Sequence, residues 1–212
     1  MQIQIPAGEA TLTGDLFVPS GSHILVLFAH GSGSSRRSSR NQFVAQALNR
    51  AGLGTLLFDL LTEEEERVDV HTAEYRFNIS LLAERLTHAT DWTQQNENTR
   101  DLRFGYFGAS TGAAAALIAA AEPPEIVGAV VSRGGRPDLA GPALGNVRAP
   151  TLLIVGGKDH AVIKLNEIAR KQMRCEVKAE IIPGATHLFE EPGALEEVAT
   201  LSANWFLSKI AV

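Results

Sequence analysis

The chain is poor in cysteine, and this scarcity excludes two kinds of structure. Cys175 is the only cysteine among the 212 residues. A single thiol cannot form an internal disulfide, and it cannot supply the paired cysteines of a CxxC metal site. We therefore expect neither a disulfide framework nor a cysteine-based metal centre.

Long apolar runs and an excess of positive charge are also lacking. The longest run of small apolar residues, Gly112–Ala121, is too short to span a bilayer. The N-terminal segment has neither the basic leader nor the apolar core of a secretion signal. The formal net charge is −5, so the overall charge recruits neither nucleic acid nor an anionic membrane. We expect a cytoplasmic protein without nucleic-acid or membrane partners.

What the chain does contain is a repeated alternation of apolar, strand-like runs with helical segments. A hairpin is expected over Ile3–Ile5 and Ala10–Val18, and the strands that follow it read as buried on both faces. These strands are predicted at His23–His30, Leu53–Leu60, Leu102–Gly108, Glu125–Gly135, Thr151–Gly157 and Cys175–Thr186.

Helical segments stand between these strands. They are predicted over about 39–51 and 72–93, directly after Ser110, after the fourth and fifth buried strands, and from about 191 onwards. Such alternation predicts a three-layer α/β sandwich with a mostly parallel sheet of seven or eight strands. We expect residues 1–212 to form a single domain.

The motif Gly108-Ala109-Ser110-Thr111-Gly112 lies between a predicted strand and a predicted helix. G-x-S-x-G in this strand–turn–helix context is typical of a serine nucleophile. The turn is tight, and side chains at the two glycine positions would collide with neighbouring backbone. The motif therefore predicts Ser110 as a nucleophile; the alternative is a glycine-rich turn without chemistry.

Asp159 and His187 follow later strands, in the order in which such a nucleophile is joined by its acid and its base. A serine hydroxyl needs a histidine to take its proton, and that histidine needs an orienting carboxylate. Two alternatives remain open: Asp159 could only cap the next helix, and His187 could be a surface loop residue. Asp59 and Asp138 are the less well placed acids.

An oxyanion hole is expected beside the nucleophile. The backbone N–H of Thr111 should supply one donor, and the loop after the first buried strand the other. In that loop we assign the donor to Ser32, with Gly31 next, and interpret His30 as structural.

Charged residues surround the expected site. Arg36, Arg37 and Arg40 follow the first buried strand, and Arg133 and Arg136 follow the fourth. One hypothesis is that such arginines, Arg36 and Arg133 in particular, bind a carboxylate or phosphate of the substrate. The alternative is that they pair with the acidic run 63–66 and tie two loops together.

The motifs HGSGSS, GASTG, LLIVGGKD and PGATHLFEEPG occur in an order that resembles the α/β-hydrolase superfamily, specifically its dienelactone-hydrolase-like branch. The stretches VVSRGGRPDLAGPAL and GATHLFEEPGALEEVA are also similar to bacterial hydrolase domains associated with phosphoribosyltransferases. Dienelactone hydrolases proper carry cysteine at the nucleophile position, where this chain has Ser110. The resemblance therefore implies an α/β-hydrolase fold with a serine esterase site, and the short segment 131–151 predicts that it has no lid domain.

Together these patterns predict a carboxylic ester hydrolase that cleaves an ester or lactone of a small soluble substrate through an acyl-enzyme on Ser110. No metal or organic cofactor is implied, and a homodimer is one expected assembly. The alternatives are an acyltransferase, thioesterase or peptidase with the same catalytic triad, or a non-catalytic binding domain.

Overall fold

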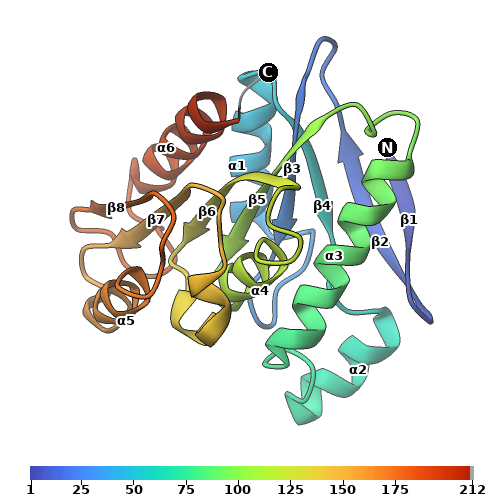
Figure 1. Cartoon of the computed structure of the whole chain (residues 1–212). Coiled ribbons are helices and arrows are strands. Elements are labelled where there is room, and N and C mark those ends of the chain that lie inside the picture. The colour runs from blue at the N-terminus through green and yellow to red at the C-terminus, as the bar shows by residue number, and fades with distance from the viewer. Residues whose placement is uncertain (211–212) are drawn as a thin grey trace.

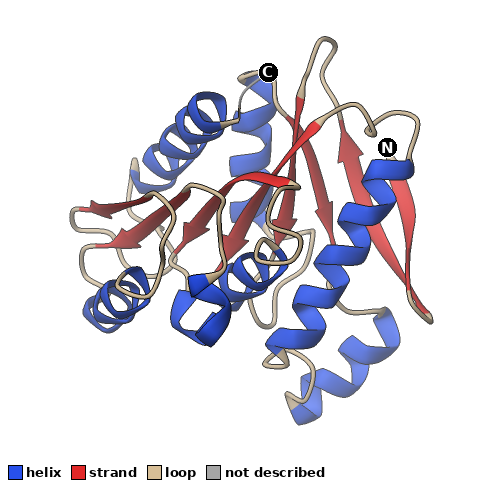
Figure 2. Ribbon diagram, in the orientation of Figure 1, coloured by secondary structure: helices blue, strands red, loops and turns tan. Residues whose placement is uncertain are grey.

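The computed structural model describes residues 1–210, which form one eight-stranded sheet with helices on both faces (Figures 1 and 2). The strand order is β1-β2-β4-β3-β5-β6-β7-β8. Strands β3 to β8 run parallel, and β1 and β2 join antiparallel at one edge. The strands are β1 (Gln2–Ala7), β2 (Ala10–Phe17), β3 (Ile24–Ala29), β4 (Gly54–Phe58), β5 (Arg103–Ala109), β6 (Val127–Arg133), β7 (Thr151–Gly156) and β8 (Val177–Ile182). The predicted fold class and strand number are confirmed.

The helices form the two outer layers. They are α1 (Ser39–Arg50), α2 (Glu63–Thr72), α3 (Ile79–Gln95), α4 (Thr111–Ala119), the 3-10 helix η1 (Pro137–Gly145), α5 (His160–Arg170) and α6 (Ala194–Lys209). Helices α1 and α6 pack together on one face, and α3, α4, η1 and α5 cover the other (Figure 1). None of the helices in residues 1–210 combines the length and the apolar character needed to cross a membrane.

The central strands are continuous apolar runs because both of their faces are covered. Every residue of β3, β4 and β7 is buried, whereas β1 alternates exposed and buried residues because only one of its faces meets the core. The carboxyl ends of the parallel strands consequently lie along one rim of the sheet, where the loops that carry chemistry meet.

The sequence interpretation missed helix α2. It begins after Thr62, whose hydroxyl accepts the N–H of Glu65 at 3.1 Å, while the Glu65 carboxylate accepts the N–H of Thr62 at 2.7 Å. This reciprocal capping box is a local signal that could have predicted the helix.

The long helix predicted over 72–93 was placed too early, because α3 begins only at Ile79. The chain turns between α2 and α3, where Ala73 adopts a left-handed conformation with φ of 56°. The buried carboxylate of Asp69 holds this turn by accepting the N–H groups of Tyr75 at 2.7 Å and Arg76 at 2.9 Å.

The segment between β6 and β7 forms only the short helix η1, which packs against α4 and α5. It builds no cap over the rim, as predicted. The closing helix α6 begins at Ala194, slightly later than the predicted start near 191.

Candidate active site

Ser110 occupies a strained turn between β5 and α4. Its φ of 50° and ψ of −121° lie where residues other than glycine are rare. The Ser110 N–H donates to the carbonyl of Arg133 at 3.3 Å, and the Ser110 carbonyl accepts the N–H of Arg136 at 3.0 Å. The last residue of β6 and the loop that follows it thus hold the turn from both sides.

The glycines of the motif are required by close packing. A Cβ at Gly108 would overlap the backbone of Ala113, and a Cβ at Gly112 would overlap the carbonyl oxygen of Ala29. The steric interpretation of the two glycines is confirmed.

Asp159 and His187 form a direct hydrogen bond. The distance between His187 Nδ1 and Asp159 Oδ2 is 2.6 Å, and the carboxyl side chain is 14% exposed against 40% for the imidazole. Asp159 occupies the N-cap position of α5, yet its side chain makes no capping bond there. Helix capping alone is therefore the wrong interpretation of Asp159. The competing acids are engaged elsewhere, since Asp59 binds Arg36 and Asp138 binds Arg136.

His187 and Ser110 both lie against the end of β6. A Cβ at Gly134 would lie 3.6 Å from His187 Cε1, and the preceding residue, Arg133, accepts the Ser110 N–H. The hydrogen bonds found within residues 1–210 include none between Ser110 and His187. Such bonds are often long in free enzymes and shorten in the complex with substrate.

The loop after β3 reaches the nucleophile. A Cβ at Gly31 would lie 3.0 Å from Ser110 Cβ. The backbone N–H of Ser32, which we expected to face an oxyanion, donates to Thr111 Oγ1 at 3.0 Å, and the two hydroxyl oxygens lie 2.9 Å apart. The N–H of Thr111 belongs to the first residue of α4 and so has no acceptor within its own helix.

His30 is buried and connects the carboxyl ends of β3 and β4 through hydrogen bonds. Its Nε2 accepts the N–H of Leu60 at 3.0 Å, so the ring proton resides on Nδ1, which donates to the carbonyl of Gly31 at 3.0 Å. Burial lowers the pKa of His30 below 6.5, although the bond to Gly31 and the charge of Asp59 act in the opposite direction. This neutral imidazole agrees with the structural interpretation.

The rim arginines differ sharply in their partners. Arg36 donates from its backbone N–H and its guanidinium to Asp59, and from Nε to Asp15 at 3.2 Å. Arg136 forms a two-pronged pair with Asp138. With two carboxylates already bound, Arg36 is a poor candidate for a substrate anion, contrary to the hypothesis from the sequence.

Among residues 1–210, Arg133 has no such partner. Its side chain is buried, with 7% of the residue exposed, and its one hydrogen bond runs from Nη2 to Asn41 Oδ1 at 3.5 Å. Burial, followed by the positive charge of Arg40, lowers the pKa of Arg133 to about 10.

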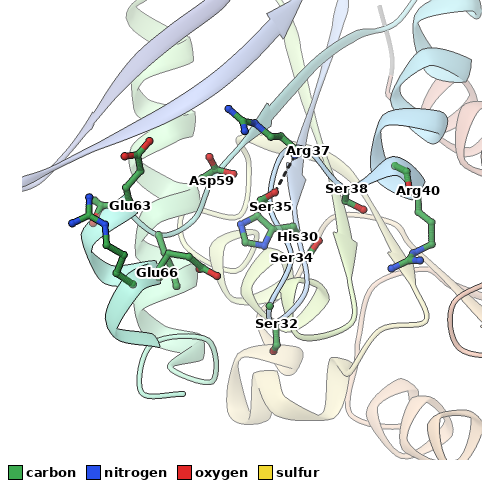
Figure 3. A pocket seen from close by; sticks show the side chains of 15 residues that line it. His30, Ser32, Ser34, Ser35, Arg37, Ser38, Arg40, Asp59, Glu63 and Glu66 are labelled. Atoms are coloured by element: carbon green, nitrogen blue, oxygen red, sulfur yellow. Dashed lines mark hydrogen bonds between the residues drawn. The ribbon is translucent and has the colours of Figure 1, made fainter. Parts of the chain in front are cut away.

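A polar pocket of about 720 Å³ opens beside the loop after β3 (Figure 3). His30 and a series of serines from this loop line it, facing Asp59, Glu63 and Glu66. Ser110 and His187 are not among its lining residues, so the pocket borders the candidate site through Ser32. Within residues 1–210, no cluster of three or more His, Cys, Asp and Glu side chains is placed to hold a metal ion.

An eight-stranded sheet whose fifth strand leads through a strained serine into a helix is the α/β-hydrolase architecture. The chain belongs to the dienelactone hydrolase family, whose model matches residues 36–205.

A crystal structure of dienelactone hydrolase from Anabaena variabilis is 57% identical, with a TM-score of 0.98 over 100% of this chain and 98% of that one. The structure of Est1E from Butyrivibrio proteoclasticus shares the fold at 18% identity, with a TM-score of 0.83 over 99% of this chain and 100% of that one. A Mycobacterium tuberculosis protein described as a phosphoribosyl transferase is 54% identical over 99% of this chain. The chain spans only 46% of that relative's length.

Proposed function

We propose that the chain is a serine hydrolase that cleaves an ester or lactone of a small soluble substrate. The observation that carries this proposal is the hydrogen bond between His187 and Asp159 beside the strained turn of Ser110. Because the carboxylate of Asp159 is bound to Nδ1 of His187, Nε2 is the ring nitrogen that can take a proton from a serine hydroxyl. This arrangement supports nucleophilic catalysis at Ser110.

In the first step, Ser110 Oγ attacks the carbonyl carbon while its proton passes to His187 Nε2. The tetrahedral intermediate then collapses, the protonated His187 gives its proton to the leaving alcohol, and an acyl-enzyme remains. Water attacks this ester with His187 again as base, which releases the acid and restores the serine. Asp159 fixes the tautomer of His187 and stabilises its charged form.

The negative oxygen of the intermediate requires two hydrogen-bond donors. The free N–H of Thr111 is the first. We assign the second to the loop at Gly31 and Ser32, because this loop lies directly against the nucleophile. The Ser32 N–H would have to exchange its bond to Thr111 Oγ1 for one to the oxyanion.

The relatives support hydrolysis as the reaction. The Anabaena protein named as a dienelactone hydrolase matches almost end to end. The match to the mycobacterial proteins supports the view that this chain corresponds to one part of a longer protein. The name of the mycobacterial proteins, a phosphoribosyl transferase, describes those longer chains as a whole.

A fluorophosphonate probe tests the nucleophile directly. The wild-type protein should be labelled at Ser110, the Ser110→Ala variant should not, and Ser208→Ala on the exposed side of α6 should be labelled like the wild type. Labelling should track turnover of simple esters such as p-nitrophenyl acetate. A folded wild-type protein that neither reacts with the probe nor hydrolyses any ester or lactone would contradict the proposal and favour a binding domain.

Acyltransferase, thioesterase and peptidase activities would use the same three residues. Their contribution is measured by the fate of the acyl-enzyme when water competes with added alcohols, thiols and amines. We expect water to be the main acceptor. Preferential transfer to one of the added acceptors would replace hydrolysis by transfer as the function.

A further inference from the structure

The guanidinium of Arg133 is a buried positive charge without a carboxylate. Its Nε and Nη1 are inaccessible to solvent and have no hydrogen-bond partner within the described residues. The guanidinium contacts two uncharged groups. Its Nη2 lies 3.5 Å from the amide oxygen of Asn41, and its Cζ lies 5.9 Å from the centroid of the Phe189 ring. An uncompensated buried charge is strongly destabilising, so a site of this kind is best explained by an anion that binds there.

A second guanidinium lies near the first. Arg40, in the first turn of α1, directly precedes Asn41, whose side chain accepts the hydrogen bond of Arg133, and the positive charge of Arg40 lowers the pKa of Arg133. The Nε of Arg40 is likewise buried and unpartnered. Its Nη1 lies 3.4 Å from Glu190, a side chain that is 66% exposed. This contact is weak because both groups are partly in water.

The acidic residues of the rim do not compensate this pair. Figure 3 shows Arg40 on one side of the pocket, and Asp59, Glu63 and Glu66 on the other. Asp59 is bound to Arg36, and the ion pair that the acidic run does form joins Glu65 to Arg85. The alternative that the acidic run neutralises the rim arginines therefore does not hold for Arg40 and Arg133.

The site adjoins the candidate nucleophile. Arg133 ends β6 and accepts the N–H of Ser110 through its carbonyl. Phe189, under its guanidinium, follows His187 by two residues. An anionic group held here would belong to the substrate whose carbonyl lies at Ser110.

We propose that Arg133 and Arg40 form a subsite for a phosphate monoester group of the ester or lactone that Ser110 attacks. This inference rests on the proposed function, because it defines one part of the substrate of that reaction. In the bound state the Arg40 side chain leaves Glu190 and uncovers the buried guanidinium of Arg133, and the phosphate lies between the two guanidinium groups.

The donor set favours phosphate over carboxylate. In the part of the chain that the structure describes, three buried guanidinium nitrogens lack partners: Nε and Nη1 of Arg133, and Nε of Arg40. A phosphate monoester presents three acceptor oxygens and a charge of about −1.5 to −2 at neutral pH. It can therefore meet three donors and neutralise two arginines, whereas a carboxylate offers two oxygens and one charge.

The first test measures binding without catalysis. Inorganic phosphate should raise the Tm of the wild-type protein, in a series matched for ionic strength with sodium chloride, and the rise should be lost in Arg133→Met. Methionine is apolar and of similar length, and replacing a buried unpaired charge by such a side chain should not prevent folding. Arg50→Met removes an exposed arginine at the far end of α1 and should keep the rise.

The second test compares two esters of the same acyl group, one with a phosphorylated alcohol and one with the free alcohol. The kcat/KM of the phosphorylated ester divided by that of the neutral ester should fall roughly 10- to 100-fold in Arg133→Met, since hydrogen bonds to charged groups are lost. The ratio should stay at its wild-type value in Arg50→Met. A third ester with a carboxylate in place of phosphate should show a smaller change.

The possible results separate the two proposals. A wild-type protein that gains stability from phosphate but turns over no ester upholds the subsite and contradicts the hydrolase. A wild-type hydrolase with no phosphate-dependent Tm rise and an unchanged ester ratio in Arg133→Met overturns the subsite and leaves the hydrolase standing. Equal dependence of the carboxylate and phosphate esters on Arg133 would overturn the assignment to phosphate.

Discussion

The backbone N–H of Ser32 donates to the hydroxyl of Thr111, although 79 residues of chain separate the two. Through this bond the loop after β3 is attached to the first turn of α4, next to Ser110. The Ser32 hydroxyl continues the connection to the carbonyl of Arg76 at 3.2 Å. Hydrogen bonds among three separate parts of the chain, at Ser32, Thr111 and the Arg76 carbonyl, thus hold the proposed oxyanion hole.

Thr111→Val should destabilise the protein and slow catalysis. Valine keeps the shape of threonine but removes the acceptor of the partly buried Ser32 N–H, and leaving such a donor unsatisfied should cost about 1 kcal/mol. Chemical denaturation should show this loss, and kcat for a simple ester should fall by roughly tenfold or more as the loop loses its position. Thr111→Ser retains the hydroxyl and should preserve both quantities. A Thr111→Val variant with wild-type stability would show that the bond contributes nothing.

Asp159→Asn should remove most of the activity while leaving the fold intact. The amide no longer selects the tautomer with a proton on Nδ1, and it no longer stabilises the charged imidazole. The loss in kcat should be on the order of 10³- to 10⁴-fold. Steady-state kinetics on one ester measures it, with circular dichroism as a check of folding. Asp138→Asn is the matched control, because Asp138 is bound to Arg136 rather than to the histidine. Comparable losses in both variants would argue against the role of Asp159.

His30 should make stability depend on pH below about 6.5. Because burial lowers its pKa in the folded protein, the unfolded chain binds a proton there at a higher pH than the folded protein does. The free energy of unfolding therefore falls as the pH drops from 6.5 towards the lowered pKa, with a slope of up to about 1.4 kcal/mol per pH unit. Protonation would also remove the Nε2 acceptor of the Leu60 N–H.

Urea unfolding between pH 7 and pH 5 measures this slope. In His30→Gln it should be smaller than in the wild type, whereas His71→Gln, which removes an exposed imidazole from α2, should retain it. An identical slope in His30→Gln and in the wild type would show that other groups cause the acid sensitivity.

Asp69→Ala should weaken both the fold and the site. Asp69 is fully buried, accepts the N–H groups of Tyr75 and Arg76, and forms an ion pair with Arg76 Nε at 2.6 Å. Its removal leaves these donors unpaired and should cost roughly 2–4 kcal/mol of stability.

Arg76 also holds the Ser32 hydroxyl, so kcat should fall together with stability in Asp69→Ala while KM changes little. Asp101→Ala changes an exposed acid and serves as the control in both measurements. A destabilised Asp69→Ala with unchanged kcat would show that the turn between α2 and α3 does not position the loop at Ser32.

Local sequence was sufficient for the framework of this protein. Continuous apolar runs predict buried parallel strands, because a strand covered on both faces needs apolar residues at every position. The glycines around Ser110 predict a tight turn. A side chain at either glycine would collide with backbone that is close by in the chain or in the adjoining strand. The capping box at Thr62 shows that even the missed helix α2 had a local signal.

The partners of the charged side chains were decided by the tertiary structure. Arg36 and Arg133 looked equivalent as rim arginines, yet Arg36 meets Asp59 and Asp15, and Arg133 meets no carboxylate within the described residues. The same holds for Ser32, whose amide is bound by a threonine that the sequence places far away. Dihedral angles and periodicity depend on neighbours in the chain, whereas ion pairs and long-range hydrogen bonds depend on which strands lie side by side and in what register. Only the folded sheet determines those neighbours.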